Sequence, residues 1–201
     1  MSELATINFT RGVPAVESFP TAELADCSAA VLAQQGDAVL QYGPAAGLAP
    51  LRAWLAEWQG VKPEQVLTGN GSLELVEFLC TAMIKPGDVV FTESPSYDRA
   101  ITLFRRHGAT IIGVPLQADG PDIDALEKLL AQHKPKLFYV IPDFQNPSGA
   151  TCSGAKRQRI VELTGQHGVL LLEDAPYRML RYRGTQEPTL FSLAPDRVLH
   201  M

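Results

Sequence analysis

The sequence predicts an α/β protein, a three-layer sandwich in which helices cover both faces of a mostly parallel sheet. Three observations support this fold class. Short aliphatic runs without polar alternation recur after Val66, which is typical of strands buried on both faces. Helix-length stretches separate these runs. Repeated strand and helix units favour parallel pairing, because a parallel crossover needs a connection about as long as a helix.

Composition narrows the class of protein. The 201 residues are 46% hydrophobic and 19% charged, as expected of a globular chain with one large domain, or one domain and a fragment. The net charge of −5 argues against a broad nucleic-acid or anionic-membrane surface, so we expect small-molecule partners. The three cysteines have no metal-ligand spacing, so we expect no metal site, no disulfide framework and a reducing cytoplasm. Neither a targeting signal nor an apolar stretch near the roughly 18 residues of a membrane span is visible.

Two helices are expected before the first strand. The first follows an extended arm, covers residues 21–35 and stops at Gly36, because glycine is common just past helix ends. The second ends at Gly60 and is indicated by apolar residues at helical spacing, namely Leu48, Leu51, Leu55 and Trp58. Turn chemistry at 41–44 separates the two helices.

The remaining elements alternate between strands and helices. The strand-like run 66–68 leads through the loop 69–72 into a helix to about Ile84, which is apolar on nearly every face and is expected to be buried. The later strands are expected at 89–91, 110–114, 137–141 and 169–172. The helices between them are expected at 97–107, 123–133 and 153–167. Ligands of such sheets bind beyond the carboxyl ends of the strands, so the residues after each run are candidates for a site.

The loop 69–72 offers an anion site. Unpaired backbone N–H groups and the helix dipole at such a junction favour a phosphate. The loop is not a dinucleotide fingerprint, because Glu74 stands at the third glycine position of G-x-G-x-x-G, and no G-K-[ST] follows for a nucleotide P-loop. A tight turn with Ser72 capping the helix explains the same residues.

Two acidic residues follow the run 169–172. Asp174 lies at the carboxyl end of this strand, where a buried carboxylate needs a partner. Because side chains alternate along a strand, Glu173 and Asp174 face opposite sides, and one of them reaches a given site. In a simpler interpretation Asp174 caps the next helix, with Pro176 in its first turn.

Two further loops follow strands and carry polar groups. The loop 143–149 sets them between a proline and a glycine, and the loop 93–97 places the ring of Tyr97 near the same sheet edge. A plain turn and ordinary packing of Tyr97 explain these residues equally well. The sequence contains neither a G-x-S-x-G elbow nor H-E-x-x-H, which argues against serine hydrolases and zinc proteases.

Other polar residues receive structural roles. His107, His133 and His167 fall in last helical turns, where the helix dipole favours a positive side chain, so we assign them no catalysis. Arg157 and Arg159 are expected on a solvated helix face.

Five motifs in this order resemble the fold-type I pyridoxal-phosphate aminotransferases. They are Tyr42-Gly43-Pro44, Gly71-Ser72, Ser94-Pro95-Ser96-Tyr97, Gln145-Asn146-Pro147-Ser148-Gly149 and Glu173-Asp174-Ala175-Pro176-Tyr177. The joint match is specific and covers essentially the whole chain, including the arm 8–14. The chain is most similar to the class I/II branch that contains 2-aminoadipate aminotransferases and the effector domains of MocR-type regulators. The resemblance implies a partial large domain of a fold-type I enzyme, with pyridoxal 5'-phosphate as cofactor.

The resemblance implies cofactor-binding roles that the chemistry of the residues supports. Gly71, Ser72 and the backbone of Leu73 would hold the cofactor phosphate at a helix N-terminus. Leu73 departs from the polar residue often found there, so only its N–H is carried over. Tyr97 would stack on the pyridine ring. Tyr42 would reach the phosphate of the neighbouring subunit's cofactor, as in the dimers of this family.

The same resemblance implies that Asp174 and Tyr177 are catalytic. Asp174 would pair with the pyridine nitrogen and keep it protonated, so that the ring accepts electrons after a proton leaves the substrate. Asn146 and Tyr177 would hydrogen-bond the phenolic oxygen of the ring. Substrate would be contacted by Asn146 and by Gly12 of the arm.

Part of the family pattern is not in this sequence. Family members continue from a strand like 198–201 into Ser-x-Ser-Lys, whose lysine forms a Schiff base with the cofactor, and then into a substrate-binding arginine and a small C-terminal domain. None of the six lysines here has that context. We therefore expect the N-terminal half of an aminotransferase, with an arm and helix at 1–38, an incomplete cofactor-binding domain at 39–201, and no turnover by the chain alone.

The expected function of the parent protein is transfer of an amino group between an amino acid and a 2-oxo acid in a cytoplasmic homodimer. Another reaction on the same cofactor, such as β-elimination or decarboxylation, stays open, because Asp174 and Asn146 serve any such carbanion. A ligand-sensing regulator domain of the same fold is the alternative outside catalysis. We expect neither a nucleic-acid nor a membrane partner, and the sequence does not identify the amino acid.

Overall fold

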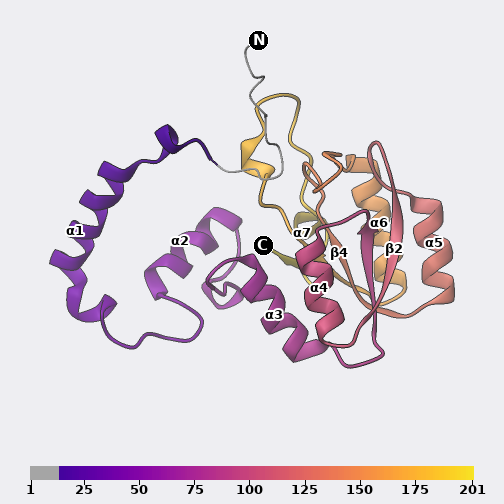
Figure 1. Cartoon of the computed structure of the whole chain (residues 1–201), viewed down its shortest axis with the longest axis horizontal. Coiled ribbons are helices and arrows are strands. Elements are labelled where there is room, and N and C mark those ends of the chain that lie inside the picture. Colours follow the sequence, from indigo (N-terminus) through magenta and orange to yellow (C-terminus); the bar gives the residue numbers. More distant parts are fainter. Residues whose placement is uncertain (1–13) are drawn as a thin grey trace, which may run out of the picture. The chain divides into compact units, whose positions relative to one another are not determined.

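The computed structural model describes residues 14–201, which form two compact units. The first unit ends at Thr68 and the second begins at Gly69. Figure 1 colours the helices of the first unit indigo to purple and the later elements magenta to yellow. The boundary expected near residue 38, between the arm with its helix and the large domain, stays a prediction.

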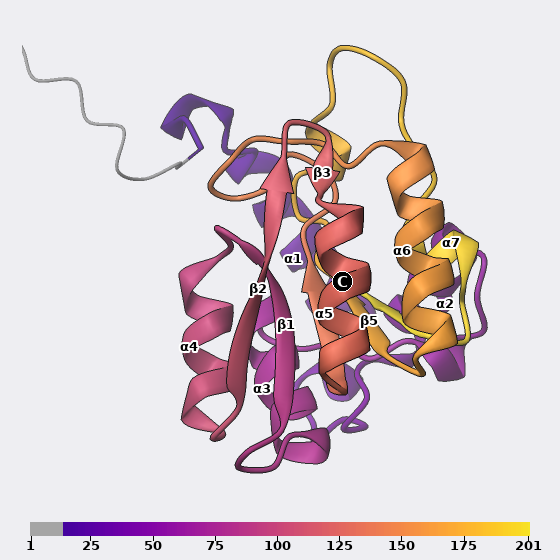
Figure 2. The ribbon, with the colours of Figure 1, turned by 90° about the vertical axis from the view of Figure 1, so that its right-hand side faces the viewer.

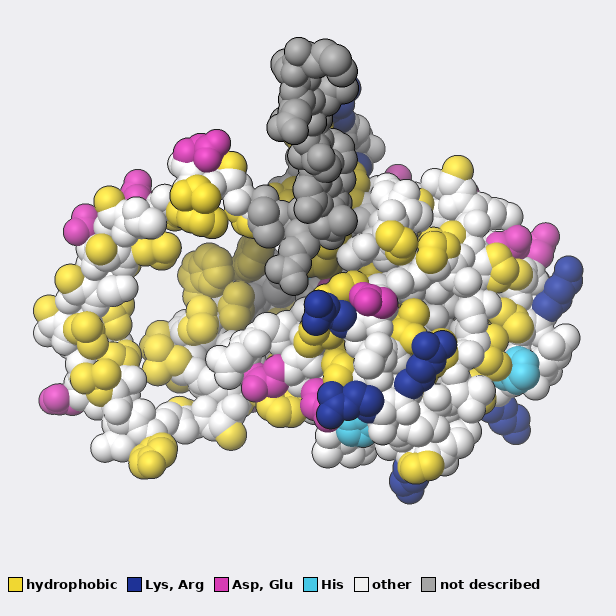
Figure 3. All heavy atoms as spheres, viewed as in Figure 1, with side chains coloured by type: hydrophobic (Ala, Val, Ile, Leu, Met, Phe, Trp, Pro, Cys, Tyr) yellow, Lys and Arg dark blue, Asp and Glu magenta, His cyan; other side chains and the backbone are white. Residues whose placement is uncertain are grey.

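The first unit consists of helices and turns. Its elements are η1 (Val16–Ser18), α1 (Thr21–Val39), α2 (Ala49–Gln59) and η2 (Pro63–Gln65). The guanidinium of Arg52 donates to the carbonyl oxygens of Pro63 (2.5 Å) and Val66 (2.8 Å), so α2 is tied to the segment around η2. No residue of α1 is buried within the chain, and Figure 3 shows its apolar side chains in yellow.

The first helix continues past its expected end at Gly36. Gln35 has non-helical angles (φ −138°, ψ 21°), so α1 is kinked there and resumes as far as Val39. The carbonyl of Gly36 accepts the N–H of Leu40 at 3.0 Å, so this glycine continues the helix. Gly60 ends α2 in the left-handed region (φ 67°), as expected.

The run 66–68 is not a strand, contrary to expectation. The N–H of Thr68 donates to the carbonyl of Ala46 at 3.0 Å, and the carbonyl of Val66 accepts from Arg52. Hydrogen bonds within the first unit therefore take the place of sheet pairing.

The second unit contains a six-stranded sheet in the order β3-β2-β1-β4-β5-β6. The strands are β1 (Val89–Ser94), β2 (Thr110–Gln117), β3 (Gly120–Pro121), β4 (Pro135–Val140), β5 (Leu170–Glu173) and β6 (Val198–His200). The helical elements are α3 (Ser72–Met83), α4 (Asp98–Arg106), α5 (Ile123–Gln132), α6 (Gly154–Gln166), η3 (Arg178–Leu180) and α7 (Leu190–Leu193). All neighbouring strands are parallel except β2 and β3, which are antiparallel. The α/β class and the mostly parallel sheet are confirmed.

Helices cover both faces of this sheet, as Figure 2 shows. Consecutive buried residues of one strand, such as Leu137 and Phe138, belong to different apolar clusters because side chains alternate between the two faces. One cluster joins the sheet to α3 and α4, and the other joins it to α5, α6 and α7. The three-layer arrangement follows from strands that are apolar on both faces.

The expectation that the first helix of this unit is buried on nearly every face is wrong for this chain. α3 buries Val76 and Cys80 against α4 and the sheet, but Phe78 is 49% exposed and Met83 is 39% exposed. Three later helices end next to a histidine as expected, with His107, His133 and His167 directly after α4, α5 and α6. Within residues 14–201, no helix is both long and apolar enough to cross a membrane.

Candidate functional site

The carboxyl ends of three parallel strands bring the candidate residues to one edge of the sheet. β4 lies between β1 and β5, and all three run in the same direction. Tyr97 follows β1, Asn146 follows β4, and Asp174 follows β5. The connections after these strands therefore converge where ligands of parallel sheets bind.

Asp174 is almost fully buried and has a single strong side-chain partner from the neighbouring strand. The hydroxyl of Tyr139 on β4 donates to Oδ2 of Asp174 at 2.5 Å. Asp174 is 6% exposed, and burial raises its pKa, while the Tyr139 hydrogen bond and the nearby His200 act in the opposite direction. The interpretation of Asp174 as a helix cap is wrong, because η3 begins after Tyr177 and the carboxylate of Asp174 lies in the sheet edge.

An aromatic cluster surrounds this carboxylate. Tyr139 is fully buried, and the ring of Phe104 from α4 meets its ring edge-on at 5.9 Å. Tyr97 is partly buried and packs against the same cluster. The structure thus brings Tyr97, Tyr139 and Asp174 together, and sequence reasoning missed Tyr139. Its signal was a side chain with a hydroxyl group within the apolar run 137–141, on the strand next to the one that leads to Asp174.

A second buried carboxylate links the loop after β1 to the loop after β4. Oε2 of Glu93 accepts the N–H of Ile141 (3.0 Å) and the side-chain amide of Gln145 (3.2 Å). The same amide of Gln145 donates to the carbonyl of Pro95 at 2.9 Å. Burial raises the pKa of Glu93 from 4.5 to about 8, opposed by these two hydrogen bonds and increased slightly by Asp174. Glu93 and Gln145 therefore hold together the two loops that carry Tyr97 and Asn146.

The loop after β4 is closed by Gln145. Its side-chain oxygen accepts the N–H of Ser148 at 2.9 Å, and its own N–H donates to the carbonyl of Ala150 at 2.8 Å. Asn146 lies inside this turn and is half-buried. A turn of this kind fixes the backbone at Asn146.

The N-terminus of α3 also lies towards this edge. α3 joins the amino end of β1 through the short turn 84–88, so its first residues point to the carboxyl ends of the strands. Gly71 is the N-cap (φ 96°, ψ 158°), a conformation that favours glycine, and Ser72 is the first helical residue. The simpler interpretation, in which Ser72 caps the helix, is therefore wrong. Glu74 instead folds back, and its carboxylate accepts the N–H of Asn70 at 2.5 Å.

The remaining expected site residues are Leu73, Tyr177, Tyr42 and Gly12. Leu73 is the second residue of α3, and Tyr177 is half-buried directly before η3. Tyr42 belongs to the first unit and is 99% exposed. Gly12 lies outside the described residues. The roles expected of these four residues stay predictions.

Arg157 is not on a solvated face, contrary to expectation. It is fully buried, and its guanidinium donates to Asp143 (2.9 Å) and to the carbonyls of Cys152 and Pro142 (both 2.9 Å). Helix α6 turns this side chain inward towards the end of β4, whereas Arg159 is exposed, as expected, and pairs with Glu162. A buried charge of this kind needs an ionised partner.

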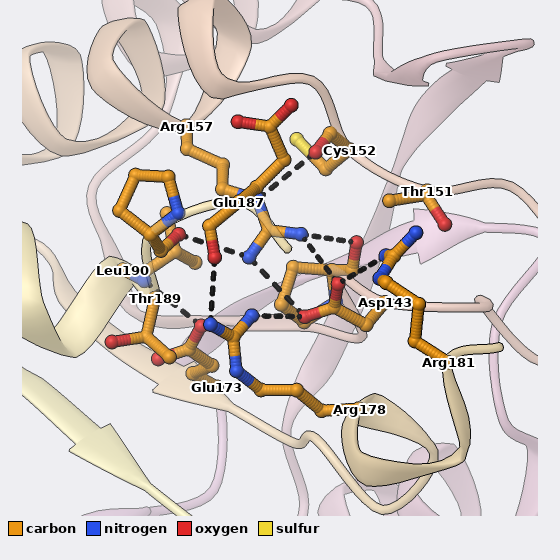
Figure 4. Close-up of polar contacts among 12 residues, drawn as sticks. Asp143, Thr151, Cys152, Arg157, Glu173, Arg178, Arg181, Glu187, Thr189 and Leu190 are labelled. Carbon is orange, nitrogen blue, oxygen red and sulfur yellow. Dashed lines mark hydrogen bonds and ion pairs between the residues drawn. The ribbon is translucent and has the colours of Figure 1, made fainter. Parts of the chain in front are cut away.

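Asp143 is that partner, and it collects three arginines. Arg178 and Arg181 also donate to its carboxylate, at 3.0 and 3.1 Å (Figure 4). Burial acts to raise the pKa of Asp143, but Arg157 and Arg178 outweigh it and lower the pKa. This cluster ties the loop that carries Asn146 to the segment that carries Tyr177.

Glu173 and Asp174 have separate partners, as alternation along the strand predicts. The carboxylate of Glu173 accepts the N–H groups of Leu190 and Phe191 (both 2.9 Å) and lies 3.0 Å from Nδ1 of His200. Glu173 therefore holds the start of α7 and leaves Asp174 as the acidic residue that joins Tyr139.

Five of the six lysines are exposed, and Lys156 is only partly exposed. The side chain of Lys156 is 14% exposed, its Nζ lies 2.7 Å from Asp119, and it donates to Gln117 at 2.6 Å. These partners hold the Lys156 ammonium beside the β2–β3 connection.

The chain is similar to known aminotransferases. The family described as aminotransferase class I and II matches residues 6–200. A 2-aminoadipate transaminase of Thermus thermophilus is 40% identical over 190 residues, covering 94% of this chain and 48% of the relative. An aromatic-amino-acid aminotransferase of Thermococcus litoralis is 34% identical over 189 residues, covering 89% of this chain and 45% of the relative. The chain thus spans about half the length of the curated relatives it matches.

Solved structures give the same result. The α-aminoadipate aminotransferase LysN of Thermus thermophilus, complexed with N-(5'-phosphopyridoxyl)-L-leucine, superposes with a TM-score of 0.91 at 39% identity, over 96% of this chain and 50% of that one. A multiple substrate aminotransferase of Thermococcus profundus gives a TM-score of 0.88 at 32% identity, over 94% and 50%.

Proposed function

Because the chain belongs to the aminotransferase class I and II family, we propose that the protein containing it transfers an amino group between an amino acid and a 2-oxo acid. Its cofactor is pyridoxal 5'-phosphate, in line with the phosphopyridoxyl compound held by a relative of 39% identity. When bound, this cofactor supplies a protonated pyridine ring that accepts the electron pair released as a proton leaves the substrate carbon.

The buried Asp174 is the observation that carries the proposal. Its carboxylate lies at the carboxyl ends of the strands, in contact with Tyr139 and beside the cluster against which Tyr97 packs. A buried carboxylate with one oxygen bonded to a neutral hydroxyl fits a protonated ring nitrogen, because the pair neutralises a charge that is costly to bury. A flat aromatic side chain nearby suits stacking on the ring.

Other residues of the site would bind the phosphate and the phenolic oxygen of the cofactor. The N–H groups at the start of α3, where Gly71 is the N-cap, suit the phosphate, although the carboxylate of Glu74 occupies the N–H of Asn70. Asn146 and Tyr177 would donate to the phenolic oxygen of the ring from the two loops that the Asp143 cluster ties together. We further propose the phosphate role of Tyr42 from a partner subunit, the backbone role of Leu73, and the substrate contact of Gly12 with Asn146.

The wider setting follows from the same proposal. We infer a homodimer in the cytoplasm, amino-acid and 2-oxo-acid substrates, and no turnover by the 201-residue chain alone. The two relatives described above are a 2-aminoadipate transaminase and an aromatic-amino-acid aminotransferase. 2-Aminoadipate and the aromatic amino acids are therefore the first substrates to examine.

A product assay on the full-length protein tests the proposal. With pyridoxal 5'-phosphate and a panel of amino acids and 2-oxo acids, we expect stoichiometric exchange of the amino group. Asp174→Ala is expected to cost on the order of several kcal/mol in kcat/KM, because an unprotonated pyridine accepts electrons poorly. Release of carbon dioxide or of a β-substituent would identify another reaction of this cofactor, and ligand binding without any product would favour a sensing domain.

A further inference from the structure

Resting on the proposed function, we propose that Tyr139 is a positioning residue that acts through Asp174. Its hydroxyl holds Oδ2 of the Asp174 carboxylate, so that Oδ1 is the oxygen that receives the N–H of the cofactor pyridine. The role is distinct from cofactor contact, because Tyr139 is fully buried within the sheet.

The sheet register places this hydroxyl. Tyr139 of β4 stands opposite Leu172 of β5, and Asp174 comes two residues after Leu172 on the same face. The N–H of Asp174 continues the ladder by donating to the carbonyl of Val140 at 2.9 Å. The contact between Tyr139 and Asp174 is therefore set by backbone pairing on both sides.

Packing prevents the ring of Tyr139 from turning away. Phe104 meets it edge-on at 5.9 Å, and the surrounding apolar cluster includes Val76, Val90 and Leu172. A side chain in a close-packed interior keeps one rotamer. The hydroxyl is thus directed at Asp174 before any ligand arrives.

The charge of the partner matters for the proposed role. An arginine or lysine beside Asp174 would neutralise the carboxylate and compete with a cationic ring nitrogen. A tyrosine hydroxyl stabilises the carboxylate without adding a positive charge, so the full negative charge stays available. Burial and the Asp174 carboxylate both raise the pKa of Tyr139, so its hydroxyl stays protonated and donates.

The test uses the full-length protein freed of its cofactor, with pyridoxamine 5'-phosphate as the probe, since this compound carries the same ring and forms no bond to lysine. Tyr139→Phe removes one oxygen atom and leaves the ring. A hydrogen bond to a charged group is lost, so we expect the Kd to rise about tenfold at neutral pH. Thermal unfolding and circular dichroism check that the variant is folded.

The pH profile of binding separates positioning from packing. The acid limb of the profile reports ionisation of Asp174 in the free protein, and Tyr139→Phe is expected to move it up by about one pH unit. Glu93 and His200 are the other titratable groups that face this carboxylate, and both are unchanged in the variant. If Tyr139→Phe does not fold, 3-fluorotyrosine at this position keeps the shape, donates more strongly, and is expected to move the limb down.

A double-mutant cycle decides whether Tyr139 acts through Asp174. In the Asp174→Asn background we expect Tyr139→Phe to change the Kd less than about twofold, because its partner charge is gone. Tyr182→Phe, at a position 91% exposed, is the matched control and should bind as the wild type does. Equal effects of Tyr139→Phe in both backgrounds, or an unmoved acid limb, would overturn the proposal. Failure of the wild type itself to bind the probe would instead overturn the proposed function.

Discussion

Four carboxylates are buried in the second unit, and each has a different kind of partner. Asp143 is surrounded by arginines, Glu173 accepts backbone N–H groups at α7, Asp174 accepts a tyrosine hydroxyl, and Glu93 accepts two amide N–H groups. The partner decides the direction of the pKa shift, since arginines lower the pKa of Asp143 whereas burial raises that of Glu93 and Asp174. At the scale of single residues, therefore, position in the tertiary structure decides which carboxylates stay charged.

Glu93 is expected to make stability depend on pH. Its pKa rises from 4.5 to about 8 on folding, so the folded protein binds one proton more than the unfolded chain between these values. The free energy of unfolding should then fall by about 1.4 kcal/mol per pH unit across this window and level off above it. Glu93→Gln keeps an acceptor for the N–H of Ile141 and for Gln145, and removes the titration.

Urea unfolding of the wild type and of Glu93→Gln at several pH values measures this contribution. The variant should gain stability relative to the wild type as the pH rises, and Glu127→Gln on the exposed side of α5 serves as the control. Parallel pH profiles for the wild type and E93Q would contradict the assignment.

Two arginines of α6 should differ strongly in their contribution to stability. Arg157→Met leaves Asp143 buried with less positive charge and also removes hydrogen bonds to the carbonyls of Pro142 and Cys152, so we expect a loss of about 3–5 kcal/mol. Arg159→Met breaks an exposed pair with Glu162 and should change stability by no more than about 0.5 kcal/mol. Urea unfolding measures both changes in the free energy of unfolding. Losses of equal size would show that the buried cluster contributes no more to stability than the exposed pair.

At the scale of elements, helix ends decide how the first unit is built. Gly36 lies in the last turn of α1 and Gly60 directly follows α2, and open space surrounds the position that a Cβ would take at either glycine. Only Gly60 has a left-handed backbone, and it closes α2. A Cβ would therefore meet no neighbouring atom at either glycine, and the two positions differ in backbone conformation.

Alanine at these two glycines should have opposite effects. Gly36→Ala is expected to stabilise α1 by about 0.5–1 kcal/mol, because alanine loses less backbone entropy in a helix. Gly60→Ala is expected to cost roughly 1–2 kcal/mol, because a Cβ is strained in the left-handed region. Hydrogen exchange of the amides in α1 and α2 reports each helix separately, and a stabilising Gly60→Ala would contradict the positive φ of this residue.

At the scale of the whole molecule, many large apolar side chains are exposed to solvent. The rings of Trp54 and Trp58 on α2 lie 5.5 Å apart and are 59% and 53% exposed, and Phe78 on α3 is 49% exposed. Exposed apolar side chains of this kind favour association. Further chain or a second subunit is expected to cover it in the full-length protein.

The isolated 201-residue chain is accordingly expected to associate. Light scattering coupled to size exclusion should show a mass that rises with concentration, because exposed apolar side chains gain by burial. The full-length protein should give one constant mass. A monodisperse chain of 201 residues that melts cooperatively as a monomer would contradict this expectation.

The lysines offer a second test at this scale. After treatment of the 201-residue chain with pyridoxal 5'-phosphate and borohydride, we expect no stoichiometric label at any single lysine. Five lysines are exposed, and Lys156 is paired with Asp119, so none has the buried, unpaired surroundings that activate a lysine amine for Schiff-base formation. Peptide mass mapping detects the label, and one fully modified lysine among the six would contradict this expectation.

The sequence by itself determined the elements of the second unit and the edge at which a site could form. Apolar runs such as 137–141 are buried on both faces. Because the residue types within each run already indicate this burial, the longer strands and helices could be predicted with small shifts of their ends. The two-residue β3 and the short helices η3 and α7 were missed, and the run 66–68 was taken for a strand, because a few residues do not show which hydrogen-bond partners lie nearby.

Only the tertiary structure decided which polar residues meet. Tyr139 is 35 residues from Asp174 in sequence, Glu93 is 52 residues from Gln145, and Arg157 is 14 residues from Asp143. Arg157 was expected on a solvated helix face, yet α6 presents that position to the buried end of β4. A local pattern reports whether a side chain suits water or an apolar core, whereas a buried charge depends on a partner that the packing of distant elements brings to it.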